Sequence, residues 1–290
     1  GSIGIGSYAA IKPGSELRVS PGYVTASGVQ VSTGPALWLQ GWEYLSQGGR
    51  SSFVLHATDG WGLLAGWRAR RQFTWSADSR NIFQLLSFVL GRAGLELSSF
   101  SNSNALVNQY PAFTISPGET GLQVVRRLLN IVPDVLFFRG HDGYILNPQA
   151  SDASAYSYGT THILRRGRYA SYSQQANRVQ VFGQGVLAQS FAWSSIATAY
   201  DRLRQVHDRN LSSLNEAQAR GDAELRQQEL EATSGEIVVP ANCGQELYDV
   251  VDITDSRAGL SQAKRRVLRL SLDYDRNAPH YEHRIQLGGV

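Results

Sequence analysis

The sequence predicts a mixed, β-rich α+β protein with two small antiparallel β-barrels, an inserted α/β domain and a helical insertion. Three observations predict this class. The last fifty residues alternate apolar and polar side chains in strand-length segments, as half-buried strands do. The apolar spacing changes near residue 76 from the period of strands to that of helices. Finally, 29 glycines, 13 tyrosines and 6 tryptophans with only 18% charged residues indicate many turns and strands.

Length and composition set the limits of the prediction. A chain of 290 residues with 42% hydrophobic content is long enough for two or three domains and can bury roughly 70–75% of its extended surface. Its single cysteine, Cys243, excludes an internal disulfide framework. No apolar run approaches the roughly 20 residues that span a bilayer, so we expect no membrane-spanning segment.

Residues 1–75 are expected to form the first barrel. Short apolar segments alternate with turn signals such as the Ser-Pro-Gly sequence at 20–22 and the pair Gly48–Gly49. Four tryptophans lie here, and we interpret them as core or interface anchors, with a carbohydrate-binding platform as the alternative. They are Trp38, Trp42, Trp61 and Trp67.

Residues 76–154 are expected to form the inserted α/β domain. A first helix is predicted to begin after Asp78 or Ser79 and to end at Gly94, since apolar residues recur between them every three or four positions. A second helix is predicted to start with a capping box of Ser116 and Glu119 and to end before Pro133. The segment YPAFTI reads as a strand, and DVLFFRGHDGYILNP as a hairpin with its turn at 141–143.

Residues 155–290 are expected to form the second barrel, interrupted by a helical insertion at about 189–236. Ser213 and Glu216 form a further capping box, and Gly235 follows the end of that helix. The helix has a thin apolar face, so we expect it on the surface or against another subunit. The predicted barrel strands carry Val238, Leu247, Val250 and Ile253, then Val267, Leu268, Leu270 and Leu272, and finally Ile285 and Leu287.

The basic residues are almost all arginines. Lys and Arg total 27 against 24 acidic residues, a net charge of +3, and the only lysines are Lys12 and Lys264. Arginine pairs well with carboxylates across interfaces, which favours assembly surfaces, although a GC-rich genome would also favour arginine codons. The candidate interface residues are Arg165, Arg166, Arg168, Tyr169, Leu225, Arg226, Arg265 and Arg266.

The sequence contains no convincing pattern for a catalytic, metal or cofactor site. The Gly4, Gly6 and Ala9 pattern is no dinucleotide loop, because no strand precedes it. Cys243 lies in a turn without a nucleophile signature. Residues three apart on a strand face opposite sides, which argues against a metal site at His280 and His283 or a carboxylate pair at Asp249 and Asp252. We therefore expect no enzyme, no catalytic residue, no metal and no cofactor.

Several of these segments resemble the phage tail hub, or baseplate hub, family. That family includes the late control protein D of phages with contractile tails, the hub part of the type VI secretion spike, and tail-tip proteins of long-tailed phages. The resemblance covers most of residues 76–290 as an order of elements. It is carried by AGLEL, YPAFTI, SPGETGLQVVRRLL, DVLFFRGHDGYILNP, NRVQVFG, GEIVVPANCGQELYDVVDITD and YEHRIQLGG.

The resemblance implies a structural virion protein located in the phage tail and assembled in the host cytoplasm. It implies a homotrimeric ring in which two barrels per subunit give six positions facing a hexameric tail tube or a distal tail protein, with a spike or tail-tip protein as a further partner. Nucleic acid would only pass through the lumen of such a ring. The alternative function is a nucleic-acid-binding module that uses the Tyr- and Arg-rich segment 156–172, or a carbohydrate-binding module that uses the N-terminal tryptophans.

Overall fold

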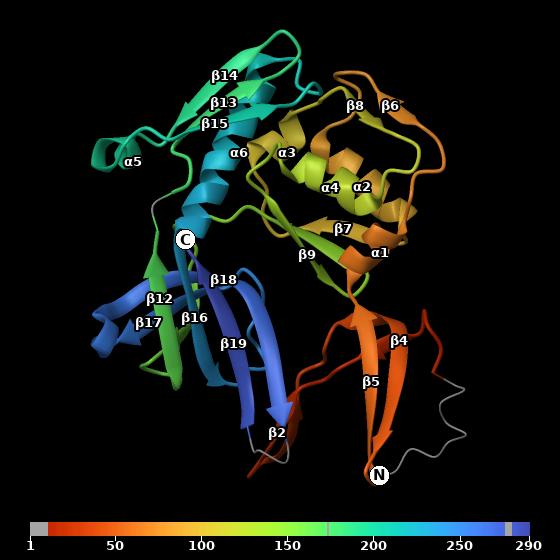
Figure 1. Ribbon diagram of the computed structural model, residues 1–290, viewed down its shortest axis with the longest axis vertical. Coiled ribbons are helices and arrows are strands. Elements are labelled where there is room, and N and C mark those ends of the chain that lie inside the picture. Colours follow the sequence, from red (N-terminus) through yellow and green to blue (C-terminus); the bar gives the residue numbers. More distant parts are fainter. Residues whose placement is uncertain (1–10, 173, 276–279) are drawn as a thin grey trace.

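The computed structural model describes residues 11–172, 174–275 and 280–290. Figure 1 shows a strand-rich α+β molecule with the helices gathered in its upper half and long strands in its lower half. The glycine-containing loop predicted at Gly4, Gly6 and Ala9 lies outside the described residues.

The first region forms a small sheet and a separate hairpin. The sheet has the order β1-β4-β5, with all pairs antiparallel, and the hairpin joins β2 to β3. A first barrel is therefore not confirmed within the described part of this region. The strands are β1 (Glu16–Arg18), β2 (Gly22–Thr25), β3 (Gly28–Val31), β4 (Ala36–Gln47) and β5 (Arg50–Thr58).

The predicted inserted α/β domain packs with residues that precede its expected start at residue 76. The helix around residues 60–66 and the short strand at 73–75 pack with this domain, where Trp61 and Trp67 join its core. A sheet of order β7-β10-β9 carries the helices on one face. The elements are α1 (Gly60–Gly66), β6 (Phe73–Trp75), α2 (Ile82–Arg92), β7 (Glu96–Ser99), α3 (Asn104–Asn108), β8 (Phe113–Ile115), α4 (Gly121–Leu129), β9 (Val135–Arg139) and β10 (Asp142–Leu146).

The two predicted helices exist, but their caps lie a few residues further along the chain. Asn81, not Asp78 or Ser79, caps α2 through a capping box with Gln84. Asp78 instead adopts a φ of 64° in the preceding loop. These caps satisfy backbone N–H groups that have no partner in the first helical turn.

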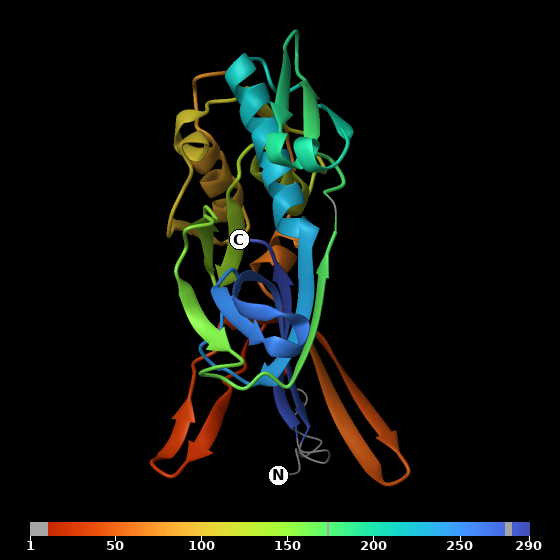
Figure 2. The ribbon, with the colours of Figure 1, turned by 90° about the vertical axis from the view of Figure 1, so that its left-hand side faces the viewer.

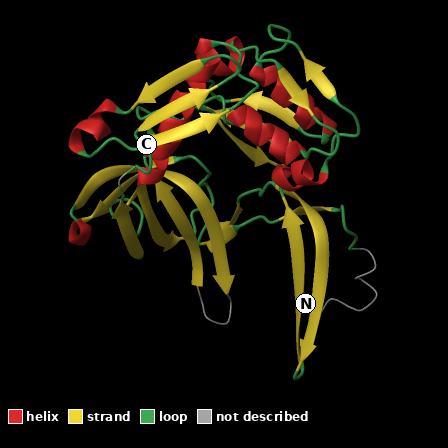
Figure 3. Ribbon diagram, turned by 45° about the horizontal axis from the view of Figure 1, so that its top comes forward, coloured by secondary structure: helices red, strands yellow, loops and turns green. Residues whose placement is uncertain are grey.

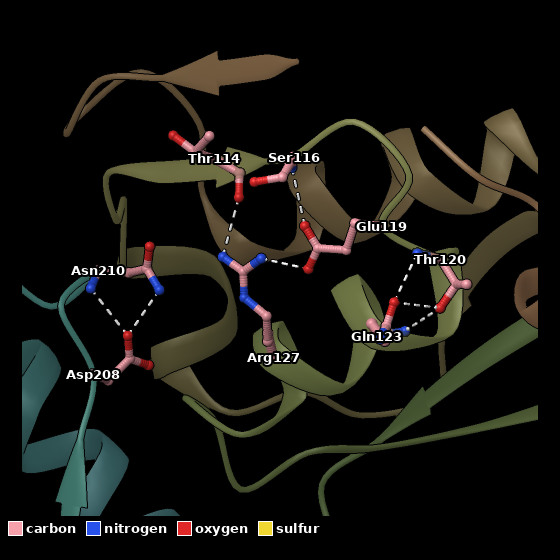
Figure 4. A network of polar contacts seen from close by, with 8 residues as sticks. All are labelled: Thr114, Ser116, Glu119, Thr120, Gln123, Arg127, Asp208 and Asn210. Atoms are coloured by element: carbon pink, nitrogen blue, oxygen red, sulfur yellow. Dashed lines mark hydrogen bonds and ion pairs between the residues drawn. The ribbon is translucent and has the colours of Figure 1, made fainter. Parts of the chain in front are cut away.

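The predicted capping box before α4 is a separate turn. Figure 4 shows that the side chain of Glu119 accepts a hydrogen bond from the Ser116 backbone N–H, while Thr120 and Gln123 form the capping box of α4 itself. The helix ends at Leu129, four residues before Pro133. Two T/S-x-x-E/Q patterns follow one another here, at 116–119 and 120–123, and the helix uses the second.

The part of the chain where a helical insertion was predicted contains a sheet as well as helices. Its three strands have the order β14-β13-β15, and Figure 1 shows the long helix α6 lying between this sheet and the inserted domain. The elements are β13 (Arg178–Phe182), β14 (Leu187–Phe191), α5 (Trp193–Thr198), β15 (Leu203–His207) and α6 (Leu214–Ala232).

The helix α6 begins at the predicted Ser213–Glu216 capping box. It was expected outside the core, but one face is buried within the subunit through Ala217, Gly221 and Leu225. Gly221 is required there, because a Cβ would lie 2.4 Å from the Ser190 hydroxyl of the covering sheet. The polar composition misled the prediction because small residues such as Ala217 and Gly221 supply much of this close contact.

The C-terminal part forms a half-barrel. Six strands follow the order β11-β17-β18-β19-β16-β12, and only the β11–β17 pair is parallel. Leu247 was expected in a strand but lies in the turn before Val250. The strands are β11 (Ser154–Tyr158), β12 (Arg166–Ser171), β16 (Thr233–Pro240), β17 (Val250–Asp255), β18 (Leu260–Asp275) and β19 (His280–Gly288), with the short 3-10 helix η2 (Ser256–Ala258) after β17.

The described residues form two hydrophobic cores. The larger joins the inserted domain to the insertion around α6. The smaller fills the half-barrel with alternate residues of its strands, such as Ile237, Val251 and Ile285, as the period of two requires. The first region contributes Trp38 to the larger core. Its hairpins extend from the lower end of the molecule on opposite sides in Figure 2.

Candidate assembly surfaces

The strand β12 forms one edge of the half-barrel and carries four of the predicted interface residues in or beside it. Among the described strands it pairs only with β16, which leaves one backbone edge open to another chain. Its first three residues, Arg166, Gly167 and Arg168, are exposed. An open, exposed strand edge can accept a further strand by backbone hydrogen bonding.

The side chains on this edge are partly engaged within the subunit. Arg165 forms an ion pair with Glu282. The Tyr169 hydroxyl donates to Asp255 Oδ2 at 3.2 Å and so ties the β12 edge to the end of β17. Burial, followed by the neighbouring Asp255 carboxylate, raises the pKa of Tyr169 to about 12, so the phenol stays protonated and keeps donating this bond.

Arg166 and Arg168 complete this cluster. An Arg166 guanidinium nitrogen lies 3.6 Å from a Glu236 carboxylate oxygen on the neighbouring strand. Both arginines are exposed and lie two residues apart, so they face the same side of β12.

The other four predicted residues lie apart from this edge. Leu225 is packed in the larger core, Arg226 donates to the Pro148 carbonyl and pairs with Glu229, and Arg265 donates to the Lys264 carbonyl. The structure thus brings Arg165, Arg166, Arg168 and Tyr169 together but not the remaining candidates.

Arg266 is buried and joins distant parts of the chain by hydrogen bonds. Its residue is 1% exposed, and its guanidinium donates to the carbonyls of Tyr248 and Gln149, each at 2.9 Å, and to Asp152 at 2.8 Å. These contacts tie the segment that leaves the inserted domain to the half-barrel.

The hairpin β4–β5 is a surface that the list of candidate residues missed. From Gln40 onward, none of the described residues of β4 is buried, and Tyr44 and Leu45 are 46% and 54% exposed. Neighbouring strand residues point to opposite faces, so this hairpin has partly exposed apolar side chains on both faces. Trp42 and Leu55 add exposed apolar area at 38% and 36%.

Two features of the sequence could have indicated this exposed hairpin. Gly48 and Gly49 adopt φ values of 57° and 76°, which is the geometry of a tight hairpin turn that two glycines favour. The adjacent bulky residues Tyr44 and Leu45 before that turn cannot both face one core. The pair therefore indicates a strand with two faces to cover.

The hairpin β2–β3 is similarly exposed and is anchored at Tyr23. Val24, Val29 and Val31 are 85%, 72% and 58% exposed. The Tyr23 hydroxyl donates to the Ala241 carbonyl at 2.6 Å, and its ring lies 5.0 Å from that of Tyr281 in the half-barrel.

The half-barrel end near this anchor contains the cysteine and a buried histidine. Cys243 Sγ lies 3.6 Å from the Tyr281 hydroxyl, whose pKa is raised to about 12, first by burial and then by the hydrogen bond with Cys243. The backbone N–H of Asn242 donates to His283 Nδ1 at 3.2 Å, and burial lowers the pKa of this imidazole. His283 is therefore held neutral as an acceptor.

The four tryptophans do not lie on one exposed surface, and one tyrosine of the Tyr-rich segment is buried. Trp38, Trp61 and Trp67 pack on the larger core while Trp42 lies on the hairpin, so they form no common sugar platform. In the Tyr-rich segment, Tyr158 is 1% exposed and donates to Gln245, so it cannot stack on a base. Within the described ranges, no group of three or more potential metal-ligating side chains occurs.

None of the helices among residues 11–172, 174–275 and 280–290 is long and apolar enough to cross a membrane.

Comparisons with solved structures place the fold among phage tail proteins. A tail protein from Neisseria meningitidis MC58 superposes with a TM-score of 0.70 at 14% identity, covering 90% of this chain and 82% of that one. The 43 kDa tail protein of prophage MuSo2 from Shewanella oneidensis gives 0.65 at 13% identity, covering 94% and 88%. Prophage tail protein gp18 from Listeria monocytogenes EGD-e gives 0.62 at 11% identity, covering 97% and 86%. No family model matches the sequence, and the comparison with curated proteins finds no match.

Proposed function

We propose that this protein is a structural subunit of a phage tail hub, in which three copies close into a ring around the tail axis. The likeness in fold to three tail proteins, across nine-tenths or more of the chain, supports the tail assignment. The exposed strands of the lower half support self-assembly. The buried faces described above form structural contacts, and we assign no catalysis to them.

The single observation that carries the proposal is the two-sided exposure of β4–β5. A long hairpin with large apolar side chains on both faces is an aggregation hazard unless a partner covers it. The open β12 edge of the half-barrel offers a complementary feature, since none of the other described strands besides β16 pairs with it where the barrel would close. In the proposed ring, the hairpin of one copy packs beside the half-barrel of the next.

This arrangement would also complete the first region, whose described strands form only a small sheet and a hairpin. The sheet β1-β4-β5 is too small to close alone, but it gains neighbours once the next copy packs against it. Each subunit then contributes two barrel-like units, and three subunits contribute six, which matches a hexameric tail tube or distal tail protein without breaking symmetry. A spike or tail-tip protein would bind the opposite side of the ring, in a virion tail assembled in the host cytoplasm.

Light scattering across a range of concentrations tests the ring. We expect the mass to rise to three times that of the 31.8 kDa subunit. The variant Leu45→Arg places a charge on the exposed hairpin and should hold the protein at the subunit mass. Leu187→Arg is the matched control, because Leu187 is comparably exposed at 48% but lies on β14 in the upper half.

Two results would contradict the proposal. One is a strict monomer at every concentration up to millimolar. The other is a trimer whose mass Leu45→Arg leaves unchanged, since the hairpin would then lie outside the contact. Circular dichroism of both variants shows whether the subunit fold is retained.

A further inference from the structure

An exposed corner of the inserted domain holds three aromatic rings in mutual contact. Phe73 and Trp75 lie on β6, and Phe88 lies on α2. The Phe88 ring centroid is 5.1 Å from that of Phe73 and 5.0 Å from that of Trp75, and Phe73 and Trp75 stack at 6.3 Å. The three rings are half-buried, so they form a rigid base that is still reached from outside.

Three guanidinium groups lie over these rings. Arg71 is 5.2 Å from the Phe73 centroid. Arg92 is 5.7 Å from Phe73 and 5.1 Å from Phe88. Arg80 is 6.0 Å from both Trp75 and Phe88. The arginine–aromatic corner consists of Phe73, Trp75, Phe88, Arg71, Arg80 and Arg92.

The positive charge of this corner is not neutralised within the subunit. Within the described chain, Arg71, Arg80 and Arg92 form no ion pair with a carboxylate, and all three are exposed. Between residues 60 and 95 the chain has five arginines and one acidic residue, Asp78. A concentration of one sign of charge on a solvent-exposed surface attracts partners of the opposite sign.

A neighbouring arginine shows what the corner lacks. Arg127 lies 4.5 Å from the Phe113 ring centroid, the same arrangement of cation and ring. Unlike the corner arginines, it pairs with Glu119 at 2.5 Å and donates to the Thr114 carbonyl (Figure 4). The same domain therefore supplies a carboxylate to one ring-stacked arginine and none to the other three.

We propose that the arginine–aromatic corner is a docking surface for a carboxylate-bearing segment of another protein. A guanidinium stacked on a ring keeps its in-plane N–H donors available, and these match a carboxylate in a bidentate pair. Stacking also restricts the long side chains before binding, which lowers the entropy lost when the partner docks. Arginine and aromatic residues without lysine are the composition of protein interfaces.

The same geometry favours a protein over nucleic acid. Single strands bind through bases stacked on open aromatic faces. In the corner, the ring faces are occupied by each other and by the guanidinium groups. The corner lies at the upper end of the molecule, near β6 and β8, whereas β4–β5 extends from the lower end (Figure 1). The docking surface therefore goes beyond the proposed ring and does not depend on it.

Binding of poly-L-glutamate, a carboxylate polymer, tests the proposal by fluorescence titration at low and at physiological salt. The variant Arg71→Glu/Arg92→Glu should weaken this binding by about tenfold or more, since two attractive contacts become repulsive. Arg269→Glu/Arg284→Glu is the matched control, because both residues are exposed, unpaired within the described chain and located in the half-barrel. It changes the net charge equally and should leave binding within about twofold.

The conservative variant Arg71→Lys/Arg92→Lys keeps the charge but loses the planar stacked donors, so we expect an intermediate loss. Three outcomes would overturn the proposal. They are no binding of poly-L-glutamate at low salt, an equal loss in the two charge-reversal variants, or tighter corner-dependent binding of an oligothymidylate than of poly-L-glutamate. The last result would assign the corner to nucleic acid.

Discussion

The inserted domain and the first region differ in where their apolar side chains are buried. In the inserted domain, α2 and α4 bury one face each, and residues such as Leu85, Leu86 and Val125 are fully or almost fully covered. In the first region, β2, β3 and the outer part of β4 have no buried residue. One region completes its core within the subunit, while the other presents surfaces that a second chain can complete.

The two regions differ in the sequence pattern that determines which faces are buried. Apolar residues that recur every three to four positions indicate a helix with a single buried face. A hairpin with bulky residues at adjacent positions, such as Tyr44 and Leu45, has no single face to bury. The second pattern is compatible with folding of the isolated chain, and in the proposed ring another chain would cover it.

The largest expected effect contrasts the two regions by truncating one leucine in each. Leu86→Ala should lower the free energy of unfolding by about 3–4 kcal/mol, because it opens a cavity in a filled core. Leu45→Ala should change it by less than about 0.5 kcal/mol in the monomer, since the side chain is exposed. Urea unfolding at low protein concentration measures both. Equal losses of unfolding free energy in the two variants would contradict the difference in burial between the two regions.

The sequence predicts periodic elements well and relations between distant elements poorly. The helices α2, α4 and α6 and the hairpin β9–β10 were predicted because their apolar spacing and turn residues are local signals. The strand order of the half-barrel depends on which edges meet in space, and local pattern holds no record of that. For the same reason, the sequence predicted two small barrels, whereas the described strands form one half-barrel, a small sheet and a separate hairpin.

The candidate site shows the same limit. Arg165, Arg166 and Arg168 were selected by composition, and they do lie along an open strand edge. Arg266 was selected by the same criterion but is buried, because carbonyls of Gln149 and Tyr248 from distant parts of the chain converge on it. A charged residue on a strand looks the same in sequence whether its partner is solvent, its own fold or another subunit.

The pH dependence of stability is expected to sharpen the description of the hairpin anchor. His283 accepts a hydrogen bond from Asn242, next to the Ala241 carbonyl that holds Tyr23. Burial lowers the folded pKa of His283 below its unfolded value of about 6.5. The unfolded state therefore binds more protons as the pH falls below 6.5. Stability is fully present above that pH and is lost below it, by at most about 1.4 kcal/mol per pH unit from this residue.

His283→Asn isolates this contribution, because the asparagine side chain keeps a neutral acceptor that does not titrate in this range. The difference in unfolding free energy between the native protein and the variant should be constant above pH 7 and shrink between pH 6 and pH 5. Urea unfolding at each pH gives the difference. A difference that is independent of pH would show that His283 does not control the 241–242 segment through its charge.

The smallest expected effect distinguishes the predicted helix cap from the observed one in the inserted domain. Thr120→Ala removes the side chain that caps α4 and should cost about 1 kcal/mol. Ser116→Ala should cost less than about 0.5 kcal/mol, because Ser116 contributes its backbone N–H, which alanine retains, to the bond with Glu119. Thermal unfolding of the two variants under identical conditions compares them directly. A larger loss for Ser116→Ala would mean that α4 begins one turn earlier in solution, and the inserted domain would then follow the first of its two consecutive capping patterns.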